Sequence, residues 1–178
     1  MSVLKLRNLD EIVRDYMETK SIAWELVDVI NKQGKPNNTV LYRGDCMYES
    51  NIVIGNKFRL WNWVASFSRD YKVAEKFANV ENAPDWYYDE YEWCNNAYDY
   101  PFSKHINNKE KLIPVIIAIE PSRYVKQLCT DEFSNKFRES EHIVSVEYIE
   151  FEIVDIKDNV LKCNVLPLTP KTSRMNLF

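Results

Sequence analysis

Two glutamates in the last third of the chain have a spacing that could support catalysis. Glu139 and Glu141 lie two residues apart in the segment 138–144, and apolar Ile143 and Val144 follow them. In an extended chain, residues i and i+2 point to the same face. Both carboxylates could therefore reach one substrate if a strand begins here. Acidic pairs at strand ends are common and are usually only solvated. The two glutamates therefore predict a catalytic site only together with other residues of the chain.

A second candidate is the arginine of a Tyr-Arg-Gly sequence. Residues 39–43 are β-branched and aromatic, so they predict a short strand that ends at Arg43-Gly44. An arginine at a strand end is usually a solvated surface residue. Its guanidinium can instead hold a phosphate through two parallel hydrogen bonds, or contact a ribose.

Two serines occupy a predicted junction between a strand and a helix. Ser66 and Ser68 close a buried strand expected at residues 58–66, and residues 69–78 predict a helix. Three apolar residues are expected on one face of this helix: Val73, Ala74 and Phe77. Ser68 has the place of a helix cap. Ser66 could instead face a cleft, where its hydroxyl would hold a carboxylate or a ribose.

The remaining elements predict an α+β fold. Residues 9–33 predict one helix, because Asn8 and Glu11 have capping-box spacing and apolar residues recur with the helical period. The apolar run at residues 112–119 predicts a central strand. Later strands are expected at 141–144, 148–156 and 160–166, a short helix or turn with a loop at 122–137, and a loose tail at 167–178. We therefore expect an N-terminal helical part and a mostly antiparallel β core with one internal helix.

Composition sets the broad class. The chain has 178 residues, 46% of them hydrophobic, which suits a single domain over residues 1–178 with its own core. A net charge of −4 argues against a general nucleic-acid binder. Four scattered cysteines predict reduced thiols, and two histidines without metal-like spacing predict no metal site. Neither a signal peptide nor a membrane span is recognisable, so we expect a cytoplasmic protein.

One stretch departs from regular patterning. Residues 81–100 hold six acidic residues, no basic ones and seven aromatics. Tyrosine and tryptophan are enriched at interfaces, so residues 81–111 predict either an interaction surface or a locally folded excursion that packs on its own domain.

The chain resembles the arginine–serine–glutamate class of mono-ADP-ribosyltransferases. The resemblance lies in three motifs, in this order and on these elements: Arg43, Ser66-Phe67-Ser68 and Glu139-Ser140-Glu141. The resemblance covers roughly residues 39–156 and is greatest to the small ADP-ribosyltransferases of tailed phages. It implies an ADP-ribosyltransferase-like split antiparallel β core around an NAD cleft. The stretch at 81–111 would then be an insertion, either a lid or a docking surface for the acceptor.

Family roles can be carried over residue by residue. The resemblance implies that Arg43 holds the NAD phosphates or the adjoining ribose and that Gly44 lets backbone approach the nicotinamide end. Ser66 would bind the nicotinamide ribose and steady the catalytic carboxylate of Glu141, and Ser68 would line the same cleft. NAD is thus the expected co-substrate, with no metal.

The same resemblance implies which residues contact the acceptor. Glu139 would align an incoming arginine side chain, and Phe137 is a candidate acceptor contact, although it could equally anchor its loop in the core. A basic or nucleic-acid-binding target protein is the expected partner, because residues 81–100 are acidic. Hydrolysis of NAD, transfer to a nucleobase, and a non-catalytic inhibitor or binding module on the same fold remain open as alternatives.

Overall fold

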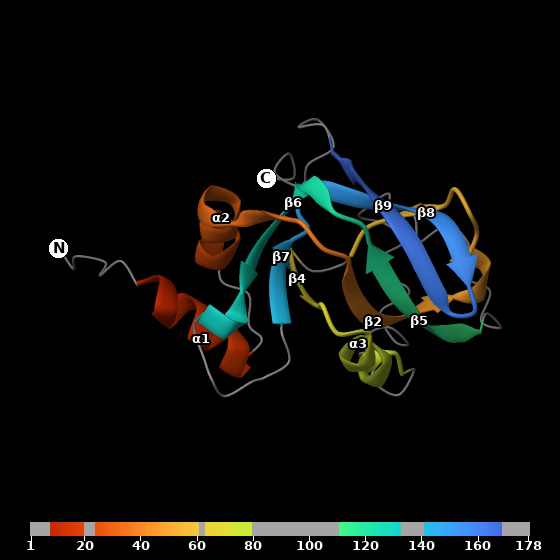
Figure 1. Cartoon of the computed structure of the whole chain (residues 1–178), viewed down its shortest axis with the longest axis horizontal. Coiled ribbons are helices and arrows are strands. Elements are labelled where there is room, and N and C mark those ends of the chain that lie inside the picture. The colour runs from red at the N-terminus through yellow and green to blue at the C-terminus, as the bar shows by residue number, and fades with distance from the viewer. Residues whose placement is uncertain (1–7, 20–23, 61–62, 80–110, 133–140, 169–178) are drawn as a thin grey trace, which may run out of the picture.

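The computed structural model describes residues 8–19, 24–60, 63–79, 111–132 and 141–168 (Figure 1). Its helices are α1 (Leu9–Thr19), α2 (Trp24–Gln33) and α3 (Tyr71–Phe77), with short 3-10 turns at Glu49–Asn51 and Thr130–Glu132. Its strands are β1 (Lys35–Asn37), β2 (Leu41–Tyr48), β3 (Lys57–Phe58), β4 (Val64–Ser68), β5 (Leu112–Ile119), β6 (Ser122–Cys129), β7 (Glu141–Ser145), β8 (Ile149–Lys157) and β9 (Val160–Pro167). The aromatic acidic stretch, Phe137 and Glu139 lie outside the described residues. None of the described helices has the length and apolar character needed to span a membrane.

The strands form one sheet in the order β1-β6-β7-β4-β2-β5-β9-β8-β3. Every neighbouring pair in the described residues is antiparallel except β5 with β9. Between β2 and β4 the register consists of a single pair, Tyr42 with Ser68. The sheet is therefore split into a four-strand half and a five-strand half. This confirms the expected α+β class and the mostly antiparallel β core.

Helices cover two separate parts of the sheet. α1 and α2 pack on the four-strand half, where their apolar residues form a cluster with Val64, Leu128 and Ile143 (Figure 1). α3 packs on β2 and β4, the two strands that border the split. The capping box at the start of α1 is present, since the Asn8 and Glu11 side chains each accept from the other residue's backbone N–H. The four-strand half is thus covered by α1 and α2, and the split itself is covered by α3.

The expectation of one helix over residues 9–33 was wrong. The structure has two helices there, and residues 20–23 between them are not described. Tyr16 of α1 and Ile30 of α2 are separated by about four helical turns, so one continuous helix would also place both residues on the same face. Both residues belong to the same buried cluster. Periodicity alone therefore could not locate the break.

Two strand predictions were also wrong in extent. The aromatic run expected as one strand at 58–66 contributes to two strands, since Phe58 ends β3 beside β8 and Val64 begins β4 beside β7. β2 continues well beyond residue 43, because it pairs with β5 from Leu41 to Tyr48. Consequently Arg43 lies inside a strand and not at its end.

Residues 122–137 were expected to form a helix or turn, but Ser122–Cys129 form strand β6. Polar side chains such as Gln127 obscured the pattern, although Gln127 is buried between β1 and β7. Pairing on both sides overrides weak side-chain preference for strand. The strands expected near 112–119, 141–144, 148–156 and 160–166 are confirmed as β5, β7, β8 and β9.

α3 begins and packs differently from the sequence prediction. Its cap is Asp70, whose side chain accepts from the Lys72 N–H, whereas Ser68 Oγ accepts from the Asp70 N–H at 3.0 Å. Of the three apolar residues expected on its inner face, Ala74 is buried and Phe77 is 52% exposed. A Cβ atom at Gly44 would lie 2.0 Å from the Ala74 carbonyl oxygen. Gly44 is therefore what allows α3 to lie directly on β2.

Substituting Gly44 with alanine should loosen α3. The new methyl group would meet backbone atoms of Ala74, Phe77 and Ala78, so we expect a loss of about 3 kcal/mol in the free energy of unfolding, measured by urea denaturation. Gly55→Ala is the control, because nothing lies within 4 Å of that Cβ and only its positive φ opposes the change. It should cost about 1 kcal/mol. Equal losses in the two variants would contradict the packing role.

β7 also buries a histidine. His142 is 1% exposed, and both ring nitrogens lack a hydrogen-bond partner among the described residues. Burial lowers its pKa below the ordinary 6.5, and the nearby Arg69 charge adds to the lowering, whereas Asp131 opposes it. Neutral imidazole is therefore the form that the fold favours.

This histidine should make the protein less stable in mild acid. Between its lowered pKa and 6.5 the unfolded chain binds more protons than the folded one, so stability falls as the pH falls through that window. Urea denaturation at about pH 7.5 and about pH 5.5 should show a smaller difference in His142→Phe than in the wild type. His105 is present in both proteins, so its contribution to the pH dependence cancels in the comparison. An unchanged difference would contradict the assignment.

Candidate active site

Strands β4 and β7 bring a serine and a glutamate together. Glu141 lies opposite Ser68 in the register, and Ser66 lies opposite Ile143, so all four side chains share one face of the sheet. Ser66 and Glu141 are diagonal neighbours on this face, and Ser66 Oγ donates a hydrogen bond to Glu141 Oε1. The Glu141 side chain is almost fully buried, with 7% exposure. A buried carboxylate needs such donors, and the Ser66 hydroxyl supplies one.

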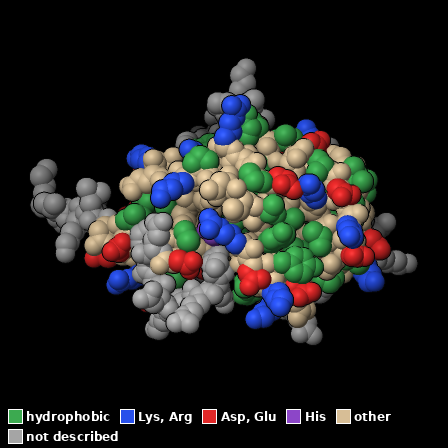
Figure 2. Space-filling model, in the orientation of Figure 1, with side chains coloured by type: hydrophobic (Ala, Val, Ile, Leu, Met, Phe, Trp, Pro, Cys, Tyr) green, Lys and Arg blue, Asp and Glu red, His purple; other side chains and the backbone are tan. Residues whose placement is uncertain are grey.

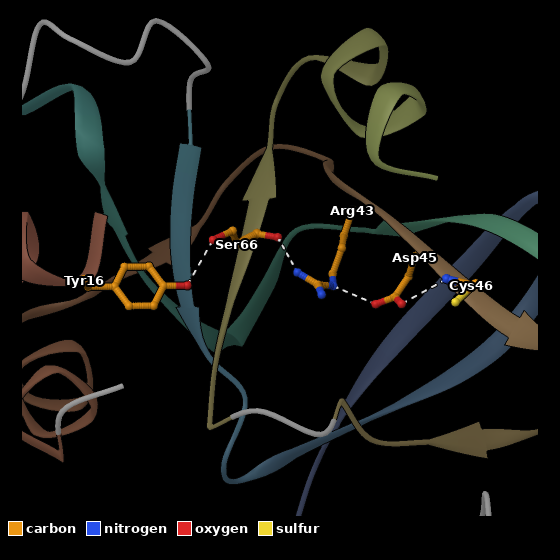
Figure 3. A network of polar contacts seen from close by, with 5 residues as sticks. All are labelled: Tyr16, Arg43, Asp45, Cys46 and Ser66. Atoms are coloured by element: carbon orange, nitrogen blue, oxygen red, sulfur yellow. Dashed lines mark hydrogen bonds and ion pairs between the residues drawn. The ribbon is translucent and has the colours of Figure 1, made fainter. Parts of the chain in front are cut away.

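The split in the sheet places Arg43 next to this pair. Its Nη1 group donates to the Ser66 carbonyl oxygen at 3.1 Å, and its Nε group donates to Asp45 Oδ2 at 2.9 Å (Figure 3). Beyond the Tyr42–Ser68 pair, β2 no longer pairs with β4, and the guanidinium takes the place of a strand partner. Within the described residues, Nη2 of Arg43 makes no hydrogen bond.

Asp45 orients the arginine and was missed by the sequence analysis. Its other carboxylate oxygen accepts from the Cys46 backbone N–H at 2.9 Å, so both oxygens are held. Burial, with a smaller contribution from the Asp45 charge, raises the pKa of the Cys46 thiol to about 11. Cys46 is therefore a neutral thiol at neutral pH and not a nucleophile.

Two further side chains reach the Ser66–Glu141 pair from other elements. The Tyr16 hydroxyl of α1 lies 3.0 Å from Ser66 Oγ, and Thr130 Oγ1 donates to the Glu141 carbonyl oxygen at 3.0 Å. Figure 3 shows Tyr16 approaching Ser66 from the side opposite to Arg43. In the sequence, Tyr16 is one of the residues that recur with the helical period over residues 9–33, which predicts only a packing role. The sole sequence signal was a polar tip on an aromatic residue at a buried position.

The structure thus brings three of the predicted site residues together, Arg43, Ser66 and Glu141. Ser68 shares the face of Ser66 and Glu141 but binds the start of α3 through its hydroxyl. A side chain at Gly44 would point at α3, not at a ligand. The predicted approach of the Gly44 backbone to the nicotinamide end therefore stays a prediction. Glu139 and Phe137 lie outside the described residues, and their roles also stay predictions.

This arrangement can stabilise two kinds of charge. A buried carboxylate in a fixed orientation can stabilise positive charge that develops on a bound sugar, since it needs no reorganisation during the reaction. A guanidinium beside it can bind an anionic group such as a phosphate. A sugar linked to a phosphate therefore matches the site in charge.

Comparisons with known proteins bear on the fold. No protein-family model and no curated protein matches the sequence. A solved structure of the ADP-ribosyltransferase Vis in complex with an inhibitor called M6 is similar at a TM-score of 0.52 and 14% identity, over 93% of this chain and 69% of that one. A structure of Vis toxin, an ADP-ribosyltransferase from Vibrio splendidus, matches at a TM-score of 0.50 and 16% identity, over 90% of this chain and 59% of that one. At these identities the likeness concerns the fold, and the chain has the split α+β fold of the ADP-ribosyltransferases.

Proposed function

We propose that the protein is an NAD-dependent mono-ADP-ribosyltransferase that transfers ADP-ribose to an arginine side chain of a target protein and releases nicotinamide. The observation that carries this proposal is the hydrogen bond from Ser66 to the buried Glu141 carboxylate, with Arg43 bound to the Ser66 carbonyl. Three segments distant in sequence supply these residues, and they meet at the split of an ADP-ribosyltransferase fold.

The residue types suit cleavage of the bond between ribose and nicotinamide. Breaking this bond builds oxocarbenium character on the ribose, and the Glu141 carboxylate would stabilise that charge from the ribose hydroxyls. Ser66 fixes the carboxylate through its hydrogen bond, so the group is already oriented when the charge develops. Arg43 would hold the NAD phosphates with the donors that Asp45 and Ser66 do not use.

The acceptor requires a second carboxylate, which acts as a base. A guanidinium is always charged in water, so an arginine acceptor has to lose a proton before it attacks. Glu139, two residues before Glu141, would align the guanidinium and take the proton. A basic target suits the acidic stretch at residues 81–100. On the face shown in Figure 2, acidic and basic side chains of the described residues are interspersed.

The central test is whether Glu141 is needed for labelling. Incubation of the protein and radiolabelled NAD with a bacterial lysate should label one protein band, and Glu141→Gln should reduce this labelling by about 100-fold or more. Glu120→Gln is the matched control. That carboxylate binds Lys162 at the surface, and its loss should leave labelling unchanged.

Three outcomes would contradict the proposal. Equal labelling by Glu141→Gln would reject the catalytic assignment. A wild-type protein that binds no NAD would instead support the non-catalytic alternative. A labelled product destroyed by nuclease, and not by protease, would identify a nucleic-acid acceptor.

A second substitution separates transfer from hydrolysis. Glu139→Gln should abolish the transfer of ADP-ribose to free arginine, because no base remains to accept the proton. Hydrolysis of NAD, in which water is the acceptor and nicotinamide is released, should remain largely intact. Both rates can be followed with NAD labelled in each half. Persistent transfer in Glu139→Gln would contradict the role in the acceptor step, and a wild type that releases nicotinamide without any transfer would identify an NAD glycohydrolase.

A further inference from the structure

We propose that Tyr16 is a positioning residue for the active site, which fixes the Glu141 carboxylate by acting through the Ser66 hydroxyl. The inference rests on the proposed function, since it assigns Tyr16 a part in the same reaction. It gives α1 a part in the active site, although residue 16 is distant in sequence from the segments that hold Arg43, Ser66 and Glu141.

The hydrogen bonds have a defined direction. A serine hydroxyl carries one hydrogen, and Ser66 donates it to Glu141 Oε1, which as a carboxylate can only accept. The contact of 3.0 Å between the Tyr16 hydroxyl and Ser66 Oγ must then be donated by Tyr16. The result is a continuous chain from Tyr16 through Ser66 to Glu141. Each bond in such a chain polarises the next and strengthens it.

Packing fixes the first member of this chain. Tyr16 is 6% exposed and lies in the buried cluster where α1 and α2 meet the four-strand half of the sheet. Its ring cannot turn away without disrupting the cluster, so the hydroxyl has one position. A serine side chain alone has three staggered rotamers. The Tyr16 hydroxyl favours the rotamer that points the Ser66 hydrogen at Glu141.

Arg43 holds the same residue from its other side. The guanidinium binds the Ser66 carbonyl oxygen, whereas Tyr16 binds the Ser66 side chain (Figure 3). Backbone and side chain of Ser66 are thus constrained by separate elements, β2 and α1. Removing the Tyr16 hydroxyl should leave the backbone in place and release only the side-chain rotamer.

Tyr16→Phe tests this because it keeps the ring and its packing. We expect the kcat for nicotinamide release to fall about tenfold, the effect of losing one hydrogen bond, with the KM for NAD and the melting temperature nearly unchanged. In a Ser66→Ala background the same substitution should have no further effect, because the hydroxyl through which Tyr16 acts is gone. Met17→Leu, in the same cluster, is the control and should keep the wild-type kcat.

Several results would overturn the assignment. Wild-type kcat in Tyr16→Phe would do so, and so would a tenfold loss that recurs undiminished in the Ser66→Ala background. A loss of kcat that Met17→Leu shares, with lower melting temperatures in both, would assign Tyr16 to packing alone. A wild type that cleaves no NAD would overturn the proposed function, and this assignment with it, whereas the preceding results would leave that function standing.

Discussion

A single backbone pair, Tyr42 with Ser68, joins the two halves of the sheet in the described part of the chain. Backbone groups beyond such a pair lose their ladder partners and have to be satisfied by side chains or solvent. The Ser66 carbonyl is one of these groups, and Arg43 satisfies it. A continuous ladder between β2 and β4 would have occupied this carbonyl. The candidate active site therefore exists because the sheet is interrupted at this point.

The interruption also explains the packing around it. Two strands joined by one pair need further support, and α3 supplies it by lying on both β2 and β4. This close approach depends on Gly44, because any side chain there would meet the backbone of α3. Arg43 and Gly44 are neighbours on one strand and therefore point to opposite faces. One residue binds the carbonyl across the split, and the next makes room for the helix that supports it.

Sequence reasoning succeeded where one property dominates. The uniformly apolar run at Leu112–Ile119 predicted a central strand, and its bounds were predicted correctly. It failed for β6, where exposed Arg123 and buried Gln127 hide the alternation, and for α1 and α2, whose shared period hides a break. Arg43, Ser66 and Glu141 were found by their resemblance to a family. Tyr16 and Thr130 were not found, because their roles come from contacts between elements that no local pattern encodes.

The bond from Thr130 to the Glu141 carbonyl has an evolutionary consequence. It ties the two ends of the connection between β6 and β7 at a buried point, immediately beside the catalytic candidate. Closing a connection of different length between fixed ends costs little extra free energy, since the entropy grows only with the logarithm of length. The intervening segment, which holds Glu139 and Phe137, can therefore change while Glu141 keeps its place. Under the proposed function, exchange of this one segment would alter the acceptor site and leave the Ser66–Glu141 pair in place.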